Sequence, residues 1–313
     1  MMAAEDRWDG GGTLAETADA CDSACLFRVE RGDECVARCL AVRATGHTDP
    51  RWDEAGFIGH FEAADDPEAV GELLATACAW LRDTGVDRIV GPLNGDTWHR
   101  YRWNVGPHEA SPFLLEPVNP EFYPRLWRDC GFLPLQTYVS QRIEDIPAVL
   151  GALGRVEEAI RDRGFCFRPF RLEEVDRELR RMYELSSVIF RDNFLYRPIT
   201  WERFRALYVG VERLIEPGLV WFCEDRSGTP VGFVFSYPDS SPGVVNVKSL
   251  GRLPGRATAG LGGALMAQSL RGAVAAGRRR ANMCLIRAGN QSGNLDRGHA
   301  QVFRSYVLYE VGP

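Results

Sequence analysis

The stretch VVNVKSLGRLPGRATAGLGG, residues 244–263, predicts a strand, a turn rich in proline and glycine, and then a helix that begins on glycine. Bare backbone N–H groups and the positive end of a helix dipole meet where such a helix begins, and together they favour an anion. Gly260, Gly262 and Gly263 leave room for a ligand to lie against the main chain. A ligand that carries phosphate is therefore expected at this turn.

Two common phosphate-binding motifs do not match the turn. A Walker-type loop needs Gly-Lys-Ser/Thr at the helix start, where this chain has Gly-Leu-Gly-Gly at 260–263. The dinucleotide fingerprint needs Gly-x-Gly-x-x-Gly, and the glycines here are spaced differently. The ligand is therefore expected to be neither ATP nor NAD.

Composition places the chain among soluble globular proteins. Its 313 residues are enough for two domains, and it is 45% apolar and 26% charged. No run of 18 apolar residues occurs, and the first residues lack the pattern of a signal peptide, so a cytoplasmic location without membrane contact is expected. The net charge of −6 argues against a nucleic-acid partner.

The nine cysteines and five histidines do not predict a metal site. Cys21-x3-Cys25 and Cys35-x3-Cys39 could suggest zinc, yet no close Cys-x2-Cys pair is present, and the histidines are scattered. We interpret the cysteines as reduced, structural side chains.

The two halves of the chain predict a similar order of elements. The second half predicts helices within 171–214, a hairpin at 219–223 and 230–237, a strand at 244–250, a helix at 260–276, a strand at 281–287, a short helix at 291–300 and a strand at 306–310. The first half predicts a hairpin at 24–30 and 34–44, a strand at 56–63, a helix at 67–84, a strand at 88–94, a helix and turn at 119–132 and a strand at 135–143. A tandem repeat of one α/β unit, spanning 20–145 and 165–313, is the simplest account. A chance match of two amphipathic helices of equal length is the alternative.

The copies differ at the turn before the long helix. Where the second copy has glycines, the first has Ala63-Ala-Asp-Asp-Pro67. Two carboxylates at a helix N-terminus satisfy the dipole internally and repel phosphate. Only the second copy is therefore expected to bind the anion.

This order of elements resembles the GNAT superfamily of acyl-CoA-dependent N-acyltransferases. That family has a Gln/Arg-x-x-Gly-x-Gly/Ala loop, and the aligned residues here are Ala257-Thr-Ala-Gly260-Leu-Gly262, with Arg256 one position before the usual Gln/Arg. The resemblance covers 165–310 well and 20–145 as a degenerate copy. It implies an α/β (α+β type) fold of two tandem units, each with a mixed, mostly antiparallel sheet flanked by helices.

The resemblance also implies a site for acetyl-CoA or another acyl-CoA. In the family the strand before the loop splays from its neighbour, and pantetheine fills the gap. By position, backbone groups of Leu250 and Arg252 would hold pantetheine, N–H groups of 257–263 would hold the pyrophosphate, and Arg256 could pair with a phosphate. The expected cofactor-binding residues are Leu250, Gly251, Arg252, Arg256, Ala257, Thr258, Ala259, Gly260, Leu261, Gly262, Gly263 and Asn290.

The sequence leaves the acid and base of such a reaction open. GNAT enzymes often have a Glu on the strand before the loop, but this strand has Asn246 and Lys248. Asp239 and Glu224 lie near the sheet in sequence, where each could equally be a solvated charge at a strand end. The expected catalytic residues are Tyr306, which could instead be a packed core residue, Asn246 and Ser292.

Acceptor-binding residues are expected in two aromatic segments. Asn193 and Tyr196 lie in a loop that often covers the acceptor in this family, and Trp98 and Arg102 belong to the aromatic and basic cluster 98–103. That cluster could instead be an interdomain packing loop.

The expected function is N-acylation of the amine of a small molecule or peptide. One alternative takes the acyl group from an aminoacyl-tRNA, or from an acyl carrier protein that would contact Arg278-Arg-Arg280 beside the loop. The other alternative is a non-catalytic CoA-binding or scaffold module.

Overall fold

The computed structural model describes residues 13–312, which fold into two compact units. Unit 1 holds the described residues up to Thr137, the segment Asp192–Pro198 and the residues from Ser305 onward; unit 2 holds Tyr138–Arg191 and Ile199–Arg304. The predicted limits of the repeats, 20–145 and 165–313, stay predictions, because a sequence repeat and a compact unit divide a chain by different criteria.

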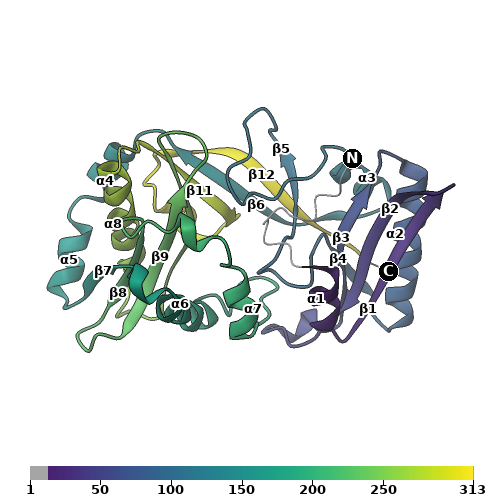
Figure 1. Cartoon of the computed structure of the whole chain (residues 1–313), viewed down its shortest axis with the longest axis horizontal. Helices are drawn as coiled ribbons and strands as arrows, with labels where there is room; N and C mark the ends of the chain where they lie inside the picture. The colour runs from purple at the N-terminus through teal and green to yellow at the C-terminus, as the bar shows by residue number, and fades with distance from the viewer. Residues whose placement is uncertain (1–12, 313) are drawn as a thin grey trace. The chain divides into compact units, whose positions relative to one another are not determined.

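Unit 1 is a mixed sheet with helices packed on it (Figure 1). Antiparallel pairs join β1 to β2, β2 to β3 and β4 to β12, while β3 and β4 are parallel. The strands are β1 (Ser23–Arg31), β2 (Glu34–Arg43), β3 (Ala55–Ala63), β4 (Arg88–Gly91), β5 (Trp103–Gly106), which pairs with β12, and the unit 1 part of β12 (Ala300–Val311). The helices are α1 (Leu14–Asp19), η1 (Pro50–Trp52), α2 (Pro67–Asp83) and α3 (Tyr123–Asp129).

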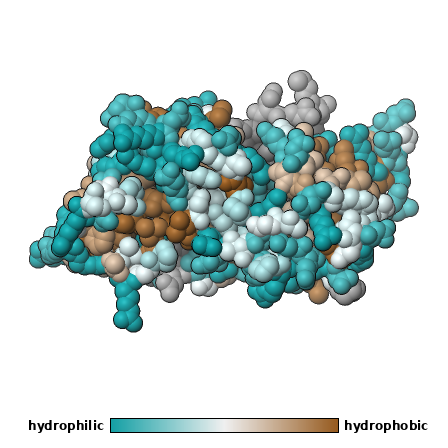
Figure 2. Space-filling view, turned by 90° about the horizontal axis from the view of Figure 1, so that it is seen from below, coloured by the Kyte–Doolittle hydropathy of each residue, from teal (hydrophilic) through white to brown (hydrophobic). Residues whose placement is uncertain are grey.

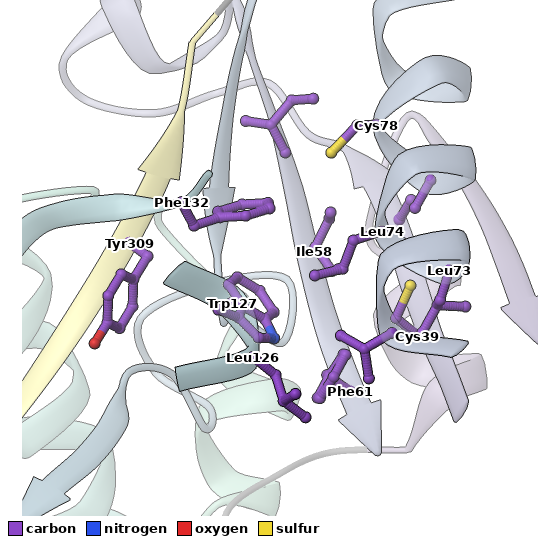
Figure 3. Close-up of a cluster of buried hydrophobic side chains, with 14 of the residues drawn as sticks. Cys39, Ile58, Phe61, Leu73, Leu74, Cys78, Leu126, Trp127, Phe132 and Tyr309 are labelled. Carbon is purple, nitrogen blue, oxygen red and sulfur yellow. The ribbon is translucent and has the colours of Figure 1, made fainter. Parts of the chain in front are cut away.

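One core cluster of unit 1 joins α2 and α3 to the sheet and is rich in aromatic rings (Figure 3). Leu73, Leu74 and Cys78 of α2 face Ile58 of β3 in this cluster. Trp127 of α3 is fully buried, with its ring centroid 5.5 Å from that of Phe61 and 4.6 Å from that of Phe132. Aromatic side chains bury large apolar areas, so this cluster holds β3 and β4 firmly.

Unit 2 is also a mixed sheet flanked by helices. Its parallel strands β10 and β11 are joined by α8, as β3 and β4 of unit 1 are joined by α2. The strand order is β6-β11-β10-β9-β8-β7, with β10 and β11 parallel and the other pairs antiparallel. The strands are β6 (Leu133–Ile143), which belongs to unit 2 from Tyr138 onward, β7 (Cys166–Pro169), β8 (Val220–Glu224), β9 (Pro230–Pro238), β10 (Val244–Arg252), β11 (Arg280–Arg287) and the first residues of β12. The helices are α4 (Ile146–Leu153), α5 (Val156–Asp162), η2 (Leu172–Glu174), α6 (Val175–Ile189), α7 (Trp201–Ala206), η3 (Glu212–Leu214), α8 (Leu261–Ala275) and η4 (Gln291–Asn294).

Helices cover both faces of the sheet in unit 2. On one face Met266 and Leu270 of α8 pack with Val245 of β10. On the other face α6 lies close to β10, since a Cβ added at Gly251 would lie 2.5 Å from Ile189 Cγ2. Glycine at this position is therefore required by the close approach of the helix.

Local sequence patterns predicted most of these elements correctly. The two hairpins and the long helices α2 and α8 lie within one or two residues of their predicted limits. The helix expected at 291–300 is wrong, because only the single 3₁₀ turn η4 forms there. Gly289 and Gly298 have φ of +83° and +85° on either side of this turn, and that conformation cannot continue an α-helix.

The described surface carries separate apolar areas. Figure 2 shows hydrophobic residues in several places on one face, with hydrophilic residues between them. Exposed apolar side chains of this kind are normal for a globular protein, so they define no site. None of the helices within 13–312 is long and apolar enough to cross a bilayer.

Candidate functional site

The parallel strands β10 and β11 separate halfway along their length. They are paired from Val244 with Arg280 to Val247 with Met283, whereas β10 continues to Arg252 and β11 to Arg287. An irregularity interrupts each strand at this point, between Val247 and Ser249 in β10 and after Met283 in β11. Beyond the last pair, the facing edges of the two strands are not paired with each other.

Backbone groups of Leu250 and Arg252 point into this split. Leu253 N donates to Val231 O of β9 at 2.8 Å, and successive residues of a strand alternate in the direction of their N–H and C=O groups. Leu253 and Val231 therefore form a hydrogen-bonded pair, whereas Arg252 with Gly232 and Leu250 with Val234 are non-hydrogen-bonded pairs. The backbone groups of Leu250 and Arg252 thus face away from β9. These are the residues expected to hold pantetheine, and that role remains a prediction.

The turn before α8 ends in a helix start without a side-chain cap. Gly260 is the N-cap residue in the left-handed conformation, with φ of +86°, and among the described residues no side chain caps the helix. Ala259 N and Leu261 N donate within the turn, to Arg256 O and Thr258 O. No described group accepts from the N–H of Gly260, Gly262 or Gly263, so these donors at the helix start are available to an anion.

The corresponding helix start in unit 1 is occupied by its own carboxylates. Asp66 Oδ1 accepts from the N–H of Glu68 and of Ala69, both at 3.0 Å, and caps α2. Asp65 pairs with Arg125 at 2.5 Å. The expectation that a carboxylate satisfies this helix start is confirmed for Asp66, whereas Asp65 is engaged by Arg125.

Replacing Asp66 by alanine should lower the free energy of unfolding by about 1 kcal/mol, the typical loss for an N-cap. Denaturant unfolding would measure the change. Asp65→Ala is the control, because it removes only an exposed ion pair of small effect. Equal losses for the two variants would contradict a capping role for Asp66.

Unit 1 also fills its own strand split. Its parallel strands β3 and β4 are paired only from Ala55 with Arg88 to Phe57 with Val90. Beyond that pair, Leu93 N donates to Ile58 O, Asn94 Oδ1 accepts from His60 N, and Tyr123 Oη accepts from Ala63 N. Burial raises the pKa of the Tyr123 phenol and keeps it neutral. Asn94 thus supplies one of the groups that fill the split of unit 1.

A row of polar side chains crosses the closed end of the split in unit 2. Arg142 Nε of β6 donates to Asn282 Oδ1 at 3.0 Å, and Asn282 Nδ2 donates to Asn246 Oδ1 at 2.8 Å. Asn246 Nδ2 in turn donates to Asp239 Oδ2 at 2.6 Å. Arginine can only donate and a carboxylate can only accept, so the two ends fix the orientation of both buried amides.

This row of polar side chains places the Asp239 carboxylate against β10, a strand that has no carboxylate of its own. Asp239 is half-buried and directly follows β9, where its N–H donates to Val244 O at 3.1 Å. Glu224 is engaged elsewhere, in an ion pair with Arg168 at 2.6 Å. Of the two carboxylates near the sheet in sequence, Asp239 is therefore the one that contacts Asn246.

The other catalytic candidates lie in different surroundings. Tyr306 belongs to unit 1, where it is fully buried and its hydroxyl donates to Glu116. Ser292 lies in η4, and its side chain is outside the described part of the structure. Asn290, predicted to contact CoA, is exposed in the loop after β11. A catalytic role for Tyr306 or Ser292 stays a prediction.

The structure brings together three of the four residues predicted to bind the acceptor. In unit 1, the ring centroids of Trp98 and Tyr196 are 5.7 Å apart, and Asn193 O accepts from Tyr196 N. Arg102 instead lies over the ring of Tyr101, with the guanidinium carbon 4.0 Å from the ring centroid. Acceptor binding by these residues stays a prediction.

The basic segment Arg278-Arg-Arg280 is not beside the glycine turn. It follows the C-terminal end of α8, and the 15 residues of this helix span about 22 Å. Arg278 forms two contacts of 2.7 Å with Glu216. The expected position of this segment beside the turn is therefore wrong, while a carrier-protein partner stays a prediction.

The cysteines form no bonds with one another. All nine are free thiols, and burial raises the pKa of Cys78 to about 11. Within residues 13–312, no group of three or more His, Cys, Asp or Glu side chains could hold a metal ion.

Comparison with known proteins finds two relatives by sequence, and no family model matches the chain. The chain is 27% identical over 229 residues to a bacterial ceramide synthase of Caulobacter vibrioides, covering 71% of this chain and 58% of that protein. It is 21% identical over 223 residues to Protein YghO of Escherichia coli, covering 70% and 56%. The chain therefore spans little more than half the length of these relatives.

Solved structures show the same fold. A tandem GNAT protein from the clavulanic acid biosynthesis pathway superposes with a TM-score of 0.56 and 11% identity, over 94% of this chain and 84% of its own. A GCN5-related N-acetyltransferase from Anabaena variabilis gives a TM-score of 0.50 and 10% identity, over 91% and 62%. The chain thus has the tandem GNAT fold that the glycine turn and the repeat predicted.

Proposed function

We propose that this protein transfers an acyl group from an acyl-CoA to the amine of an acceptor, with CoA bound by unit 2. The observation that carries the proposal is the turn before α8, where Gly260 leaves the helix start uncapped beside the split between β10 and β11. Free N–H groups at a helix start suit a pyrophosphate, and the open edge of β10 suits the amide groups of pantetheine.

The phosphates, the pantetheine and the thioester of acyl-CoA each have a partner in this proposal. The N–H groups of Gly260, Gly262 and Gly263 hold the pyrophosphate, and Arg256 is exposed next to them for a further phosphate contact. Leu250 and Arg252 bind pantetheine through their backbone groups. A backbone N–H near Leu250 stabilises the negative charge that develops on the thioester oxygen. The thioester supplies the activated acyl group.

Asp239 takes the proton of the attacking amine in this account. The amine nitrogen forms a bond to the acyl carbon, the bond from that carbon to sulfur breaks, and the thiolate leaves with the CoA. Asn246 holds the Asp239 carboxylate through the contact of 2.6 Å. The Asp239 carboxylate, held in position by Asn246, can therefore act as the general base, a role that a glutamate on the strand before the loop has in many GNAT enzymes.

The name of one relative bears on the acceptor. A protein 27% identical is called a bacterial ceramide synthase, and a ceramide is the amide of a long-chain amine and a fatty acid. N-acylation is the reaction class implied by that name. We therefore propose an amine acceptor and include long acyl chains and long-chain amines among the substrates to test.

Release of free thiol from acyl-CoA in the presence of amines tests the activity. Acetyl-CoA and a long-chain acyl-CoA would each be combined with small amines, peptides and a long-chain amino alcohol, and thiol would be measured with a colorimetric reagent. We expect amine-dependent thiol release with at least one pair. If CoA binds but no pair releases thiol, the protein is a CoA-binding module and the proposed activity is wrong.

A further inference from the structure

The glycine turn of unit 2 is held by two arginines that bond its carbonyl groups. Arg252 Nη1 donates to Leu253 O at 3.2 Å, to Gly255 O at 3.1 Å and to Thr258 Oγ1 at 2.8 Å. Arg163 Nη1 donates to Ala259 O at 2.7 Å, and its Nη2 donates to Ala257 O. The carbonyls of four alternating residues, 253, 255, 257 and 259, are thereby bound to guanidinium groups.

These bonded carbonyl groups also fix the direction of the N–H group of the residue that follows each of them. The C=O of one residue and the N–H of the next point in opposite directions across a trans peptide bond. With the carbonyls of Gly255, Ala257 and Ala259 bonded to arginines, the N–H groups of Arg256, Thr258 and Gly260 point the other way. No backbone group in the described chain accepts from any of these three. Together with the N–H groups of Gly262 and Gly263, they form a set of turn and helix-start donors without a backbone acceptor among the described residues.

Arg163 comes from the helical linker α4–α5, far from the turn in sequence. This linker packs on the N-terminal end of α8, since a Cβ added at Gly263 would lie 3.6 Å from Leu153 Cδ2. Glu157 of α5 pairs with Arg271 of α8 at 2.6 Å, and burial raises the pKa of Glu157. The linker therefore fixes where the Arg163 guanidinium lies.

The charge of Arg163 is not neutralised by a carboxylate. Within the described residues it forms no ion pair, and besides the two carbonyls its guanidinium contacts the ring of Phe165, 5.4 Å from the centroid. A positive charge behind a nest of N–H groups adds to the attraction for an anion in front of it.

We infer that Arg163 is a positioning residue of the anion site, through which the α4–α5 linker sets the shape of the CoA-binding turn. The inference rests on the proposed function, because it assumes that the turn binds the pyrophosphate of CoA. Arg163 acts through the carbonyls of Ala257 and Ala259, so its loss should loosen the turn even when no ligand is present.

Three variants separate this role from simple charge or folding effects. Arg163→Ala removes both hydrogen bonds, Arg163→Lys keeps the charge but loses the two-armed geometry, and Arg155→Ala is the control on the same linker. The side chain of Arg155 is 86% exposed, and its one ion pair within residues 13–312 is with Glu158. Hydrogen exchange of the amides of Ala259 and Leu261, which bond within the turn, is measured without ligand, and the Kd for acetyl-CoA by calorimetry.

For Arg163→Ala we expect faster exchange of both amides and a Kd at least roughly tenfold higher, the effect of losing a hydrogen bond to a charged group. Arg163→Lys should be intermediate, and Arg155→Ala should match the wild type. Unchanged exchange overturns the inference, whether or not the Kd rises, because a higher Kd alone would mean that Arg163 acts through its charge or by direct contact with the ligand and not by holding the turn. If the wild type binds no CoA, the proposed function fails, while the exchange data still decide the role of Arg163.

Discussion

Replacing Gly260 by valine is expected to abolish acyl-CoA binding, with a loss of affinity of at least roughly a hundredfold, or about 2.7 kcal/mol. Gly260 has φ of +86°, a conformation that a β-branched residue adopts only with strain of about 1–3 kcal/mol. The turn would relieve this strain by rotating the peptides that carry the N–H groups of the anion site. Calorimetric titration with acetyl-CoA measures the loss.

Gly277→Val is the matched control for this variant. Gly277 follows the other end of α8 with φ of +78°, and a Cβ added there meets no atom within 4 Å. The two variants carry a similar backbone strain, so they should lose similar stability, but Gly277→Val should bind CoA like the wild type. If Gly260→Val binds CoA like the wild type, CoA lies elsewhere and the assignment of the turn as its site is wrong.

Replacing Asp239 by asparagine is expected to lower the rate of amine acylation by about 10²–10⁴-fold, the usual contribution of a general base. The amide oxygen of asparagine can still accept from Asn246 Nδ2, so the polar row should persist, while the contact of Oδ1 with Ser241 N is lost and stability falls slightly. Affinity for acyl-CoA should stay the same, because the change removes only a charge at the closed end of the split. Thiol release under saturating substrates measures the rate.

The double variant Asp239→Asn with Asn246→Asp moves the carboxylate from residue 239 to its neighbour in the polar row, residue 246 on β10. The new carboxylate on β10 would accept from Asn282 Nδ2 as the amide of Asn246 does now, so the row from Arg142 stays bonded. We expect this variant to recover part of the activity lost in the single variant. A single variant as fast as the wild type would contradict the assignment of Asp239 as proton acceptor.

The parts of the site that depend on neighbours in sequence could be predicted. Glycine at 260, 262 and 263 after an apolar strand indicates an uncapped helix start, because that signal is local. Asp65 and Asp66 indicate a capped one for the same reason, and Asp66 does cap α2. The tandem fold followed from the order of such local signals.

The parts that depend on distant residues could not be predicted. Arg163 lies 94 and 96 residues from the carbonyls that it holds, and Arg142 lies 140 residues from Asn282. Tyr123 bonds Ala63 N in the unit 1 split from 60 residues away. Hydrophobic periodicity reports which face of an element is buried and not which distant polar group will meet it. The basic run at 278–280 shows the converse error, since closeness in sequence to α8 did not place it near the turn.

Titration of the wild-type protein with acetyl-CoA and with a long-chain acyl-CoA tests the central claim most directly. The account predicts one CoA per chain, because the turn of unit 2 is open while unit 1 caps its helix with Asp66 and fills its split with its own side chains. No binding of either acyl-CoA, or two molecules bound per chain, would contradict it.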